Sequence, residues 1–352
     1  MYDKTFKDIF KFFYFQRCGE KLTSEYASKW SHEKCHSSLA RIYGTEDKID
    51  VSGGWHDAGD YGRYMVAYGK TMGDLLSAYN ENRDVFGDDF NIPESNNGIP
   101  DILDEIKPQL NWMLKMQNQE NGGVYHKVSC TSFPSVIMPD KKNNELIVCP
   151  ISITATANFA AVMAMAYETF KDIDSDLANK YINAGERAWE YIERSPDKGG
   201  NGFVNPSGIH TGEYPDRFDD DDIYWAAAQL FKATGKDKYN EAFKELFKKY
   251  GMMPGYDLAK LGYYGTIAYI NSDKGDEGIR TQLKNKMIKK AVPGMLVAGT
   301  NCILGDAIAK NLFINEPAAK CYIDSREVYS VNEVDIYWNS ALIYLMSKTV
   351  MK

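Results

Sequence analysis

Helical periodicity runs through almost the whole chain and constrains its fold more than any other feature. Apolar residues recur every three to four positions in four segments, the pattern of helices with one buried face. These segments are 64–79, 102–114, 177–192 and 239–247, and Gly251 closes the last one. Two further segments, 156–167 and 223–231, are apolar on nearly all sides, as helices buried all round are. The alternation predicts an all-α fold with two concentric helical layers.

Polar and glycine-rich sequence collects between the helical segments. The main stretches of this kind are 52–60, 91–100, 118–123, 196–222 and 271–276. The sequence contains no clear period-two strand pattern, no linker and no low-complexity tract. Its 352 residues suffice for one large domain. We therefore expect a single domain over 1–352, with no separate carbohydrate-binding or immunoglobulin-like domain.

The net charge of −8 argues against a nucleic-acid or membrane partner, because either would favour a basic face. No window approaches the roughly 18 apolar residues of a membrane span. The first 19 residues lack the apolar run of a signal peptide, so we expect a cytoplasmic protein or a secreted one whose leader has been removed. Aromatic residues make up 13% of the chain, which indicates either core packing or a cleft where rings stack on sugars.

The segment 50–61, DVSGGWHDAGDY, is the most informative in the chain. Its glycines permit a tight backbone that presents Asp57 and Asp60 toward one point. Two carboxylates can orient a water molecule and take its proton, which inverting glycoside hydrolysis needs on one face of a sugar. Alternatively, Asp60 caps a helix beginning near Tyr61 and Asp57 is a turn residue.

The segment 329–339, YSVNEVDIYWN, supplies the complementary group. Glu333 lies among apolar and aromatic neighbours, and burial there would raise its pKa as a general acid requires. The alternative is a carboxylate at the start of a helix, favoured by the helix dipole.

Together the two segments resemble glycoside hydrolase family 9, which has a GGW-x-DAGD-type loop early in its catalytic module and an NE-x-x-I-x-(Y/W)N segment near its end. Four more stretches, at 95–128, 149–167, 211–239 and 293–301, resemble that family in the same order. The start, FFYFQRCG, looks most like bacterial members whose module follows an immunoglobulin-like domain. The resemblance implies an (α/α)6 barrel and inverting cleavage of β-1,4-linked glucan.

By this resemblance Asp60 is the base, Asp57 helps to hold the water, and Glu333 protonates the leaving oxygen. The residues expected to contact the substrate are His126, Trp55, Tyr61 and Trp338. A core position in the last helix is an equal alternative for Trp338.

Two metal sites are suggested. Cys18, Cys35, His36 and His56 are ligands that a structural zinc accepts, and zinc-binding family members have a similarly spaced set. Without the resemblance, free buried thiols are the favoured interpretation, because the spacing is not that of a short zinc-finger motif. The six cysteines are also too sparse for a disulfide framework. The residues Thr211, Asp216, Asp221 and Asp222 lie where the family often binds calcium, and a solvated acidic loop is the alternative.

The sequence departs from the family between about 270 and 293, where further barrel helices and then a Pro-His-His-Arg loop usually stand. That motif is missing, since the histidines are 32, 36, 56, 126 and 210. We therefore expect a barrel incomplete by about one hairpin, with altered specificity, a homo-oligomer that covers the wall, or lost activity as consequences. The leading hypothesis is an endo-acting β-1,4-glucanase. An exo-acting hydrolase of short cello- or chito-oligosaccharides and a silent carbohydrate-binding homologue are the alternatives.

Overall fold

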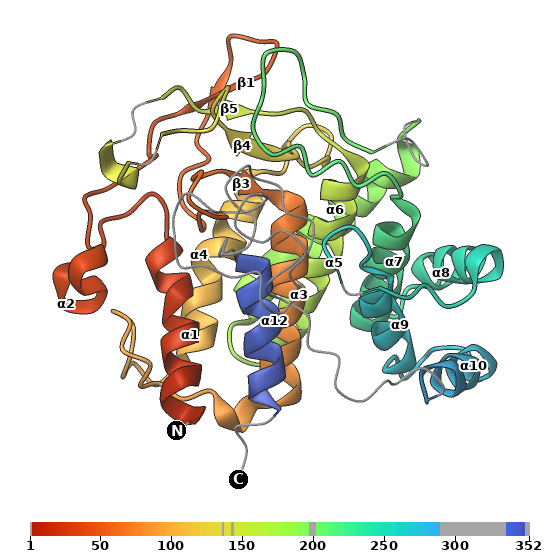
Figure 1. Ribbon diagram of the computed structural model, residues 1–352. Coiled ribbons are helices and arrows are strands. Elements are labelled where there is room, and N and C mark those ends of the chain that lie inside the picture. Colours follow the sequence, from red (N-terminus) through yellow and green to blue (C-terminus); the bar gives the residue numbers. More distant parts are fainter. Residues whose placement is uncertain are drawn as a thin grey trace, which may run out of the picture.

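Helices dominate the chain in the computed structural model, which describes residues 2–135, 137–141, 144–196, 202–255, 257–288 and 336–348 (Figure 1). The longer helices are α1 (Tyr2–Gln16), α3 (Met65–Glu81), α4 (Asp101–Lys115), α5 (Ile153–Phe170), α6 (Ser175–Arg194), α7 (Asp220–Thr234), α8 (Asp237–Tyr250), α9 (Gly262–Ile270), α10 (Glu277–Ile288) and α12 (Ile336–Ser347). Single turns complete the set: α2 (Ser24–Ala27) and the 3-10 turns Ser28–Trp30, Arg83–Val85 and Pro139–Lys141.

The helices form two layers, as the sequence predicts. The inner row runs α12, α3, α5, α7, α9, each helix packed on the next. Outside it, α1 packs on α12, α4 on α3, α6 on α5, α8 on α7 and α10 on α9. This pairing is that of an (α/α) barrel, so the predicted fold class is confirmed. The stretch in which we expect a missing hairpin, between about 270 and 293, contains α10, and only its residues from 289 on lie outside the described residues.

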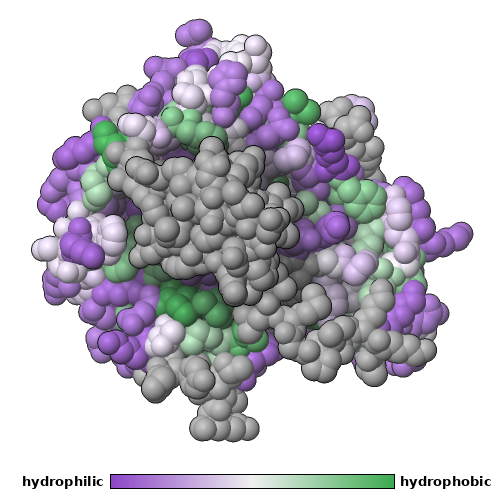
Figure 2. Space-filling model, viewed as in Figure 1, coloured by the Kyte–Doolittle hydropathy of each residue, from purple (hydrophilic) through white to green (hydrophobic). Residues whose placement is uncertain are grey.

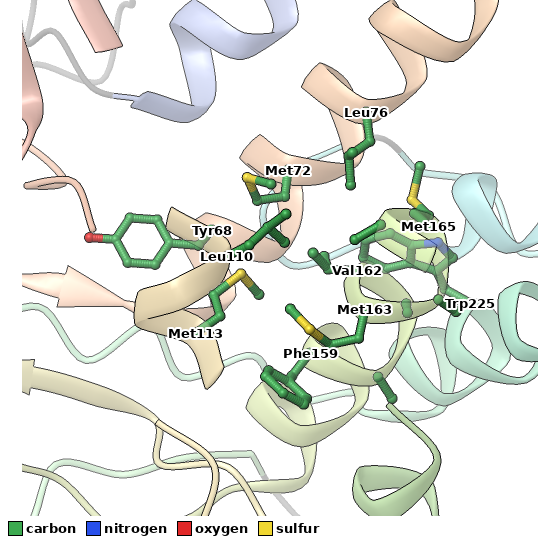
Figure 3. Close-up of a cluster of buried hydrophobic side chains, with 14 of the residues drawn as sticks. Tyr68, Met72, Leu76, Leu110, Met113, Phe159, Val162, Met163, Met165 and Trp225 are labelled. Atoms are coloured by element: carbon green, nitrogen blue, oxygen red, sulfur yellow. The ribbon is translucent and has the colours of Figure 1, made fainter. Parts of the chain in front are cut away.

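The inner helices are apolar on most sides because neighbours surround them. In α5, buried residues occupy nearly every position from Ile153 to Phe170. Figure 3 shows how α3, α4, α5 and α7 meet, with Met72, Leu110, Val162 and Trp225 directed into one cluster. The prediction of helices buried all round at 156–167 and 223–231 is therefore confirmed.

The outer helices keep one apolar stripe and expose the rest. In α6 the buried residues include Tyr181, Ala188 and Ile192, which lie on one face. Hydrophilic residues accordingly cover much of the rim in Figure 2. Helix α8 ends before Gly251, whose φ of 72° suits the end of a helix, as the sequence predicts. None of the described helices has the length and hydrophobicity to cross a membrane.

Five short strands form a sheet at one end of the helices (Figure 1). They are β1 (Ala40–Ile42), β2 (Lys48–Ile49), β3 (Arg63–Tyr64), β4 (Lys127–Ser129) and β5 (Ile147–Val148), in the order β2-β1-β5-β4-β3. Only β1 and β5 run parallel. No sequence pattern predicts these strands, because two or three residues are too short for a period-two pattern. Strand β4 pairs with β3 and joins the segments that build the site.

Candidate active site

The loop 50–61 connects β2 to β3 and lies against the end of α1. Its main chain is fixed by the N–H of Cys18, which donates to Gly54 O at 2.7 Å, and by that of His56, which donates to Gln16 O at 2.7 Å. Gly54 has a φ of 73°, and a Cβ there would meet Trp112 at 2.8 Å. Only glycine fits this position, which explains the second glycine of the motif.

The two aspartates of the loop each receive a tyrosine hydroxyl. Tyr214 donates to Asp57 Oδ2 at 2.5 Å, and Tyr64 donates to Asp60 Oδ2 at 2.5 Å. The tyrosine rings pack on each other with centroids 4.5 Å apart. Burial and the nearby carboxylates raise the pKa of both tyrosines far above the usual value, so both remain protonated donors. The carboxylates are thus held in place by a paired aromatic support.

Both aspartates line a cavity of about 1020 Å³. Its walls come from segments distant in sequence: 57–60, 133–134, 212–217 and 258–259. Phe133, on the rim, has 56% of its surface exposed. Carboxylates beside apolar side chains form a lining on which a sugar can bind by hydrogen bonds and ring stacking.

Trp55 and Tyr61, two of the residues predicted to contact the substrate, are engaged in other contacts. Trp55 is fully buried, and its Nε1 donates to Glu105 Oε1 at 2.8 Å. Tyr61 donates to Ile137 O, and its ring contacts His36 and His56. Trp55 is therefore a core residue without a surface for sugar, and Tyr61 lies beside the predicted zinc ligands.

His126, which is predicted to contact sugar, is also fully buried. Its ring stacks on Phe203 with centroids 3.8 Å apart, Nδ1 bonds to Ser152 Oγ, and Nε2 bonds to Glu213 O. Burial lowers the pKa of His126 to about 3, which keeps the ring neutral. Its contacts fix the segment next to Tyr214.

Glu333 lies outside the described residues, as does the side chain of Trp338, although Trp338 itself belongs to α12. Helix α12 begins at Ile336, three positions after Glu333 in the sequence. The structure therefore describes the side of the site that holds Asp57 and Asp60.

Cys18, Cys35, His36 and His56 converge in a buried cluster, with their ligand atoms all within 4.8 Å of one another. His36 Nδ1 lies 3.0 Å from His56 Nε2, and Cys35 Sγ lies 3.8 Å from the same nitrogen. Burial lowers the pKa of His36, so its ring is neutral, as a metal ligand must be. Two sulfur and two nitrogen atoms at these separations fit a tetrahedral zinc.

Asp216, Asp221 and Asp222 form a second buried cluster. One carboxylate oxygen of each has no hydrogen-bond partner among the described residues. Burial raises the pKa of Asp216 to about 7 and that of Asp221 to about 6. Unpartnered carboxylate oxygens suit a hard cation such as calcium.

Thr211 was predicted to join these aspartates, but its oxygens are already used. Its backbone oxygen accepts from Asn205 Nδ2 at 2.7 Å, and its hydroxyl lies 2.7 Å from Ser129 Oγ. Lys127 Nζ donates to both oxygens of Thr211. A second cation at these oxygens would meet the repulsion of the ammonium, so these contacts argue against Thr211 as a metal ligand.

Three residues of the site were not predicted: Tyr64, Tyr214 and Lys127. Tyr64 lies only four positions after Asp60, a local signal that could have been read. Tyr214 and Lys127 come from distant segments, and only the fold brings them to the loop.

An (α/α) barrel with two ordered aspartates in a large cavity defines a glycoside-hydrolase-like site, and the comparisons with known proteins agree. The model of Glycosyl hydrolase family 9 matches residues 2–272 and 264–346. The chain belongs to glycosyl hydrolase family 9.

The relatives are longer than this chain, and the matches cover different shares of their length. A cellodextrinase of Butyrivibrio fibrisolvens is 29% identical and aligns with 98% of this chain and 83% of its own length. That alignment runs over 458 residues, more than the 352 here, so the relative contains segments that this chain lacks. Endoglucanase D of Acetivibrio thermocellus is 36% identical over 78% of this chain and 45% of its own length, so the chain spans less than half of that protein.

Among solved structures, a thermostable endoglucanase (D468A) from Alicyclobacillus acidocaldarius superposes with a TM-score of 0.93 at 25% identity. The match covers 100% of this chain and 84% of that one.

Proposed function

We propose that this protein hydrolyses β-1,4-glucosidic bonds in cellulose or related β-glucans with inversion at the anomeric carbon. The observation that carries the proposal is the pair of tyrosine-held carboxylates at the cavity of a family 9 chain. Asp60 takes a proton from the attacking water. Asp57, its carboxylate fixed by Tyr214, holds that water in line with the sugar.

Glu333 is the proposed general acid. The support is its segment, which resembles the end of the family's catalytic module and leads into α12. Protonating the leaving oxygen from the opposite face requires its carboxyl to stand about 6.5–9.5 Å from that of Asp60.

Short oligosaccharides are the second candidate substrate, with exo-acting release from a chain end. The cellodextrinase relative, matched over 83% of its length, favours this reading. The missing Pro-His-His-Arg motif points the same way, because the family uses that loop to bind glucose units on the non-reducing side.

A structural zinc held by Cys18, Cys35, His36 and His56 is part of the proposal. His56 directly precedes Asp57. Cys18 lies two positions after the end of α1, and its N–H donates to Gly54 O. The metal would therefore clamp the catalytic loop to the N-terminal helix and support the position of Asp57.

Calcium is proposed at Asp216, Asp221 and Asp222, without Thr211. A divalent ion would compensate the repulsion among three buried carboxylates. It would also tie the segment before α7 to Leu261, whose N–H donates to Asp221 Oδ2 at 2.6 Å.

Activity on two substrates tests the proposal. The purified protein is incubated with carboxymethyl cellulose and with cellotetraose, and chain length and products are followed. Internal scission of the polymer supports the endo reading, and terminal release from cellotetraose supports the exo reading. No turnover of either would overturn the function. Replacing Glu333 by Gln should lower the rate by about 100-fold or more, and full retained activity would remove Glu333 from the mechanism.

A further inference from the structure

Lys127, in β4, carries a fully buried ammonium group that is surrounded by oxygens of one segment. Nζ donates to Asn205 Oδ1 at 2.5 Å, to Gly212 O at 2.7 Å, and to Thr211 Oγ1 and O at 3.1 and 3.4 Å. All four acceptors are neutral. Within the described part of the chain, Lys127 forms no ion pair.

Burying an ammonium group costs several kcal/mol unless polar groups replace its water. Here the 202–216 segment supplies them, and its backbone closes around the cation. Phe203 N donates to Pro215 O at 2.9 Å. Gly202 has a φ of 74°, and a Cβ there would lie 2.0 Å from Asp216 O. The segment is thus folded back on itself with Lys127 inside the turn.

The same ammonium lies beside the aromatic support of the aspartates. Nζ is 5.7 Å from the centroid of the Tyr64 ring, within the range of a cation–π contact. Tyr64 packs on Tyr214, and the two hydroxyls donate to Asp60 and Asp57. Gly212, an acceptor for Lys127, is two positions before Tyr214. One cation therefore contacts both tyrosine-bearing parts of the site.

We propose that Lys127 is a positioning residue for the catalytic aspartates, an internal cation that organises the 202–216 segment as a bound metal ion organises a loop. The proposal rests on the function proposed above. Without the charge, four oxygens that converge on one point lose their shared donor, and the segment must rearrange. Tyr214 then shifts, and the orientation of Asp57 shifts with it. A positive charge near the ring also strengthens the hydrogen bond that Tyr64 donates to Asp60.

The alternative is a lysine that merely fills space in the core. Methionine has nearly the same length and would fill that space without the charge. A space-filling role therefore predicts that K127M keeps its activity, whereas a positioning role predicts a loss in kcat.

The first test is the kinetics of K127M on the better of the two substrates. The matched control is K232M, because Lys232 also pairs with a partly buried group, Glu168, but near the end of α7 remote from the 202–216 segment. We expect kcat of K127M to fall about 100-fold while KM changes less than about threefold, since small displacements of reacting groups act on the chemical step. K232M should keep the wild-type kcat.

Chemical rescue separates the charge from the side-chain volume. In K127A, propylammonium replaces the atoms removed from the side chain, and 1-propanol replaces them without the charge. Recovery of kcat with the amine alone supports the internal cation. Equal effects of both compounds would contradict it.

Backbone hydrogen exchange over 202–216 gives a readout that does not depend on activity. K127M should exchange faster there than K232M and the wild type, while α5 stays protected. If the wild type cleaves no glucan, the proposed function fails. The comparison of hydrogen-exchange rates then still tests whether Lys127 organises the 202–216 segment. If K127M matches K232M in exchange, and also in kcat where there is turnover, the proposal is overturned.

Discussion

The loop 50–61 and the 202–216 segment meet at the same cavity, yet the chain holds them in different ways. The first is fixed by main-chain hydrogen bonds to the end of α1 and by a glycine that admits Trp112. The second is fixed by two side chains at the start of β4: Lys127, the first residue of the strand, and His126, just before it, bind its oxygens. The first region carries the carboxylates proposed to react, and the second carries a hydroxyl that donates to one of them. The difference teaches that the reacting groups and their support can have unrelated sequence signals.

The largest expected effect lies in the first region. Asp60→Asn removes the proposed base and should lower kcat about 1000-fold, with little change in stability because the amide keeps the shape of the carboxyl. The control is Asp47→Asn, an exposed position in the turn before β2. Steady-state kinetics on cellotetraose or carboxymethyl cellulose measure kcat of both variants. A loss of kcat of tenfold or less in Asp60→Asn would exclude Asp60 as the base.

The tyrosines test whether the second region supports the first. Tyr214→Phe and Tyr64→Phe each remove one hydrogen bond to a carboxylate and should lower kcat about 10- to 100-fold. Tyr239→Phe is the matched control, because Tyr239 donates to Glu186 at 3.0 Å on the outer helices. If only Tyr64→Phe lowered kcat, the 202–216 segment would have no part in orienting Asp57.

Zinc should matter for the stability of the first region. Cys35→Ser is expected to reduce bound zinc from about one equivalent to less than about half, and to lower Tm by about 5 °C, because binding energy contributes to folding. Metal analysis and a thermal melt measure both quantities. Cys130→Ser changes a buried cysteine outside the cluster and should leave the zinc content unchanged. Wild-type protein purified without zinc and lacking the metal would contradict the site.

Calcium should have the smallest effect, at the end of the second region and the start of α7. Adding EGTA to the wild type should lower Tm by about 2–4 °C, since a ligand stabilises the folded state that binds it. Asp221→Asn should abolish this response, because it removes one of three clustered carboxylates. A variant that responds to EGTA as the wild type does would leave the acidic cluster without a calcium role.

Sequence reasoning reached the helical layers and the loop 50–61 because both depend on local patterns. The buried helices α5 and α7 can be recognised from residues that are apolar on nearly all sides, and Asp57 and Asp60 lie in one short motif. It did not show that Trp55 and His126 are buried, because a sequence places a residue near a site without showing which way its side chain points.

Contacts between distant segments were beyond local patterns altogether. Lys127 lies 78 and 85 positions before its acceptors Asn205 and Gly212. Thr211 was predicted to bind a metal because no sequence pattern indicates that Lys127 donates hydrogen bonds to its oxygens. The strands were not predicted for a related reason. A strand of two or three residues is defined by its pairing with a neighbouring strand, which the local sequence does not show.

The stereochemistry of the first product tests the central claim most directly. Proton NMR of cellotetraose hydrolysis, recorded before mutarotation equalises the anomers, reports which anomer forms at the cleaved bond. An account in which Asp60 activates water on one face predicts the α-anomer from a β-linked substrate. Initial release of the β-anomer would mean retention through a covalent intermediate, and would contradict the role assigned to Asp60.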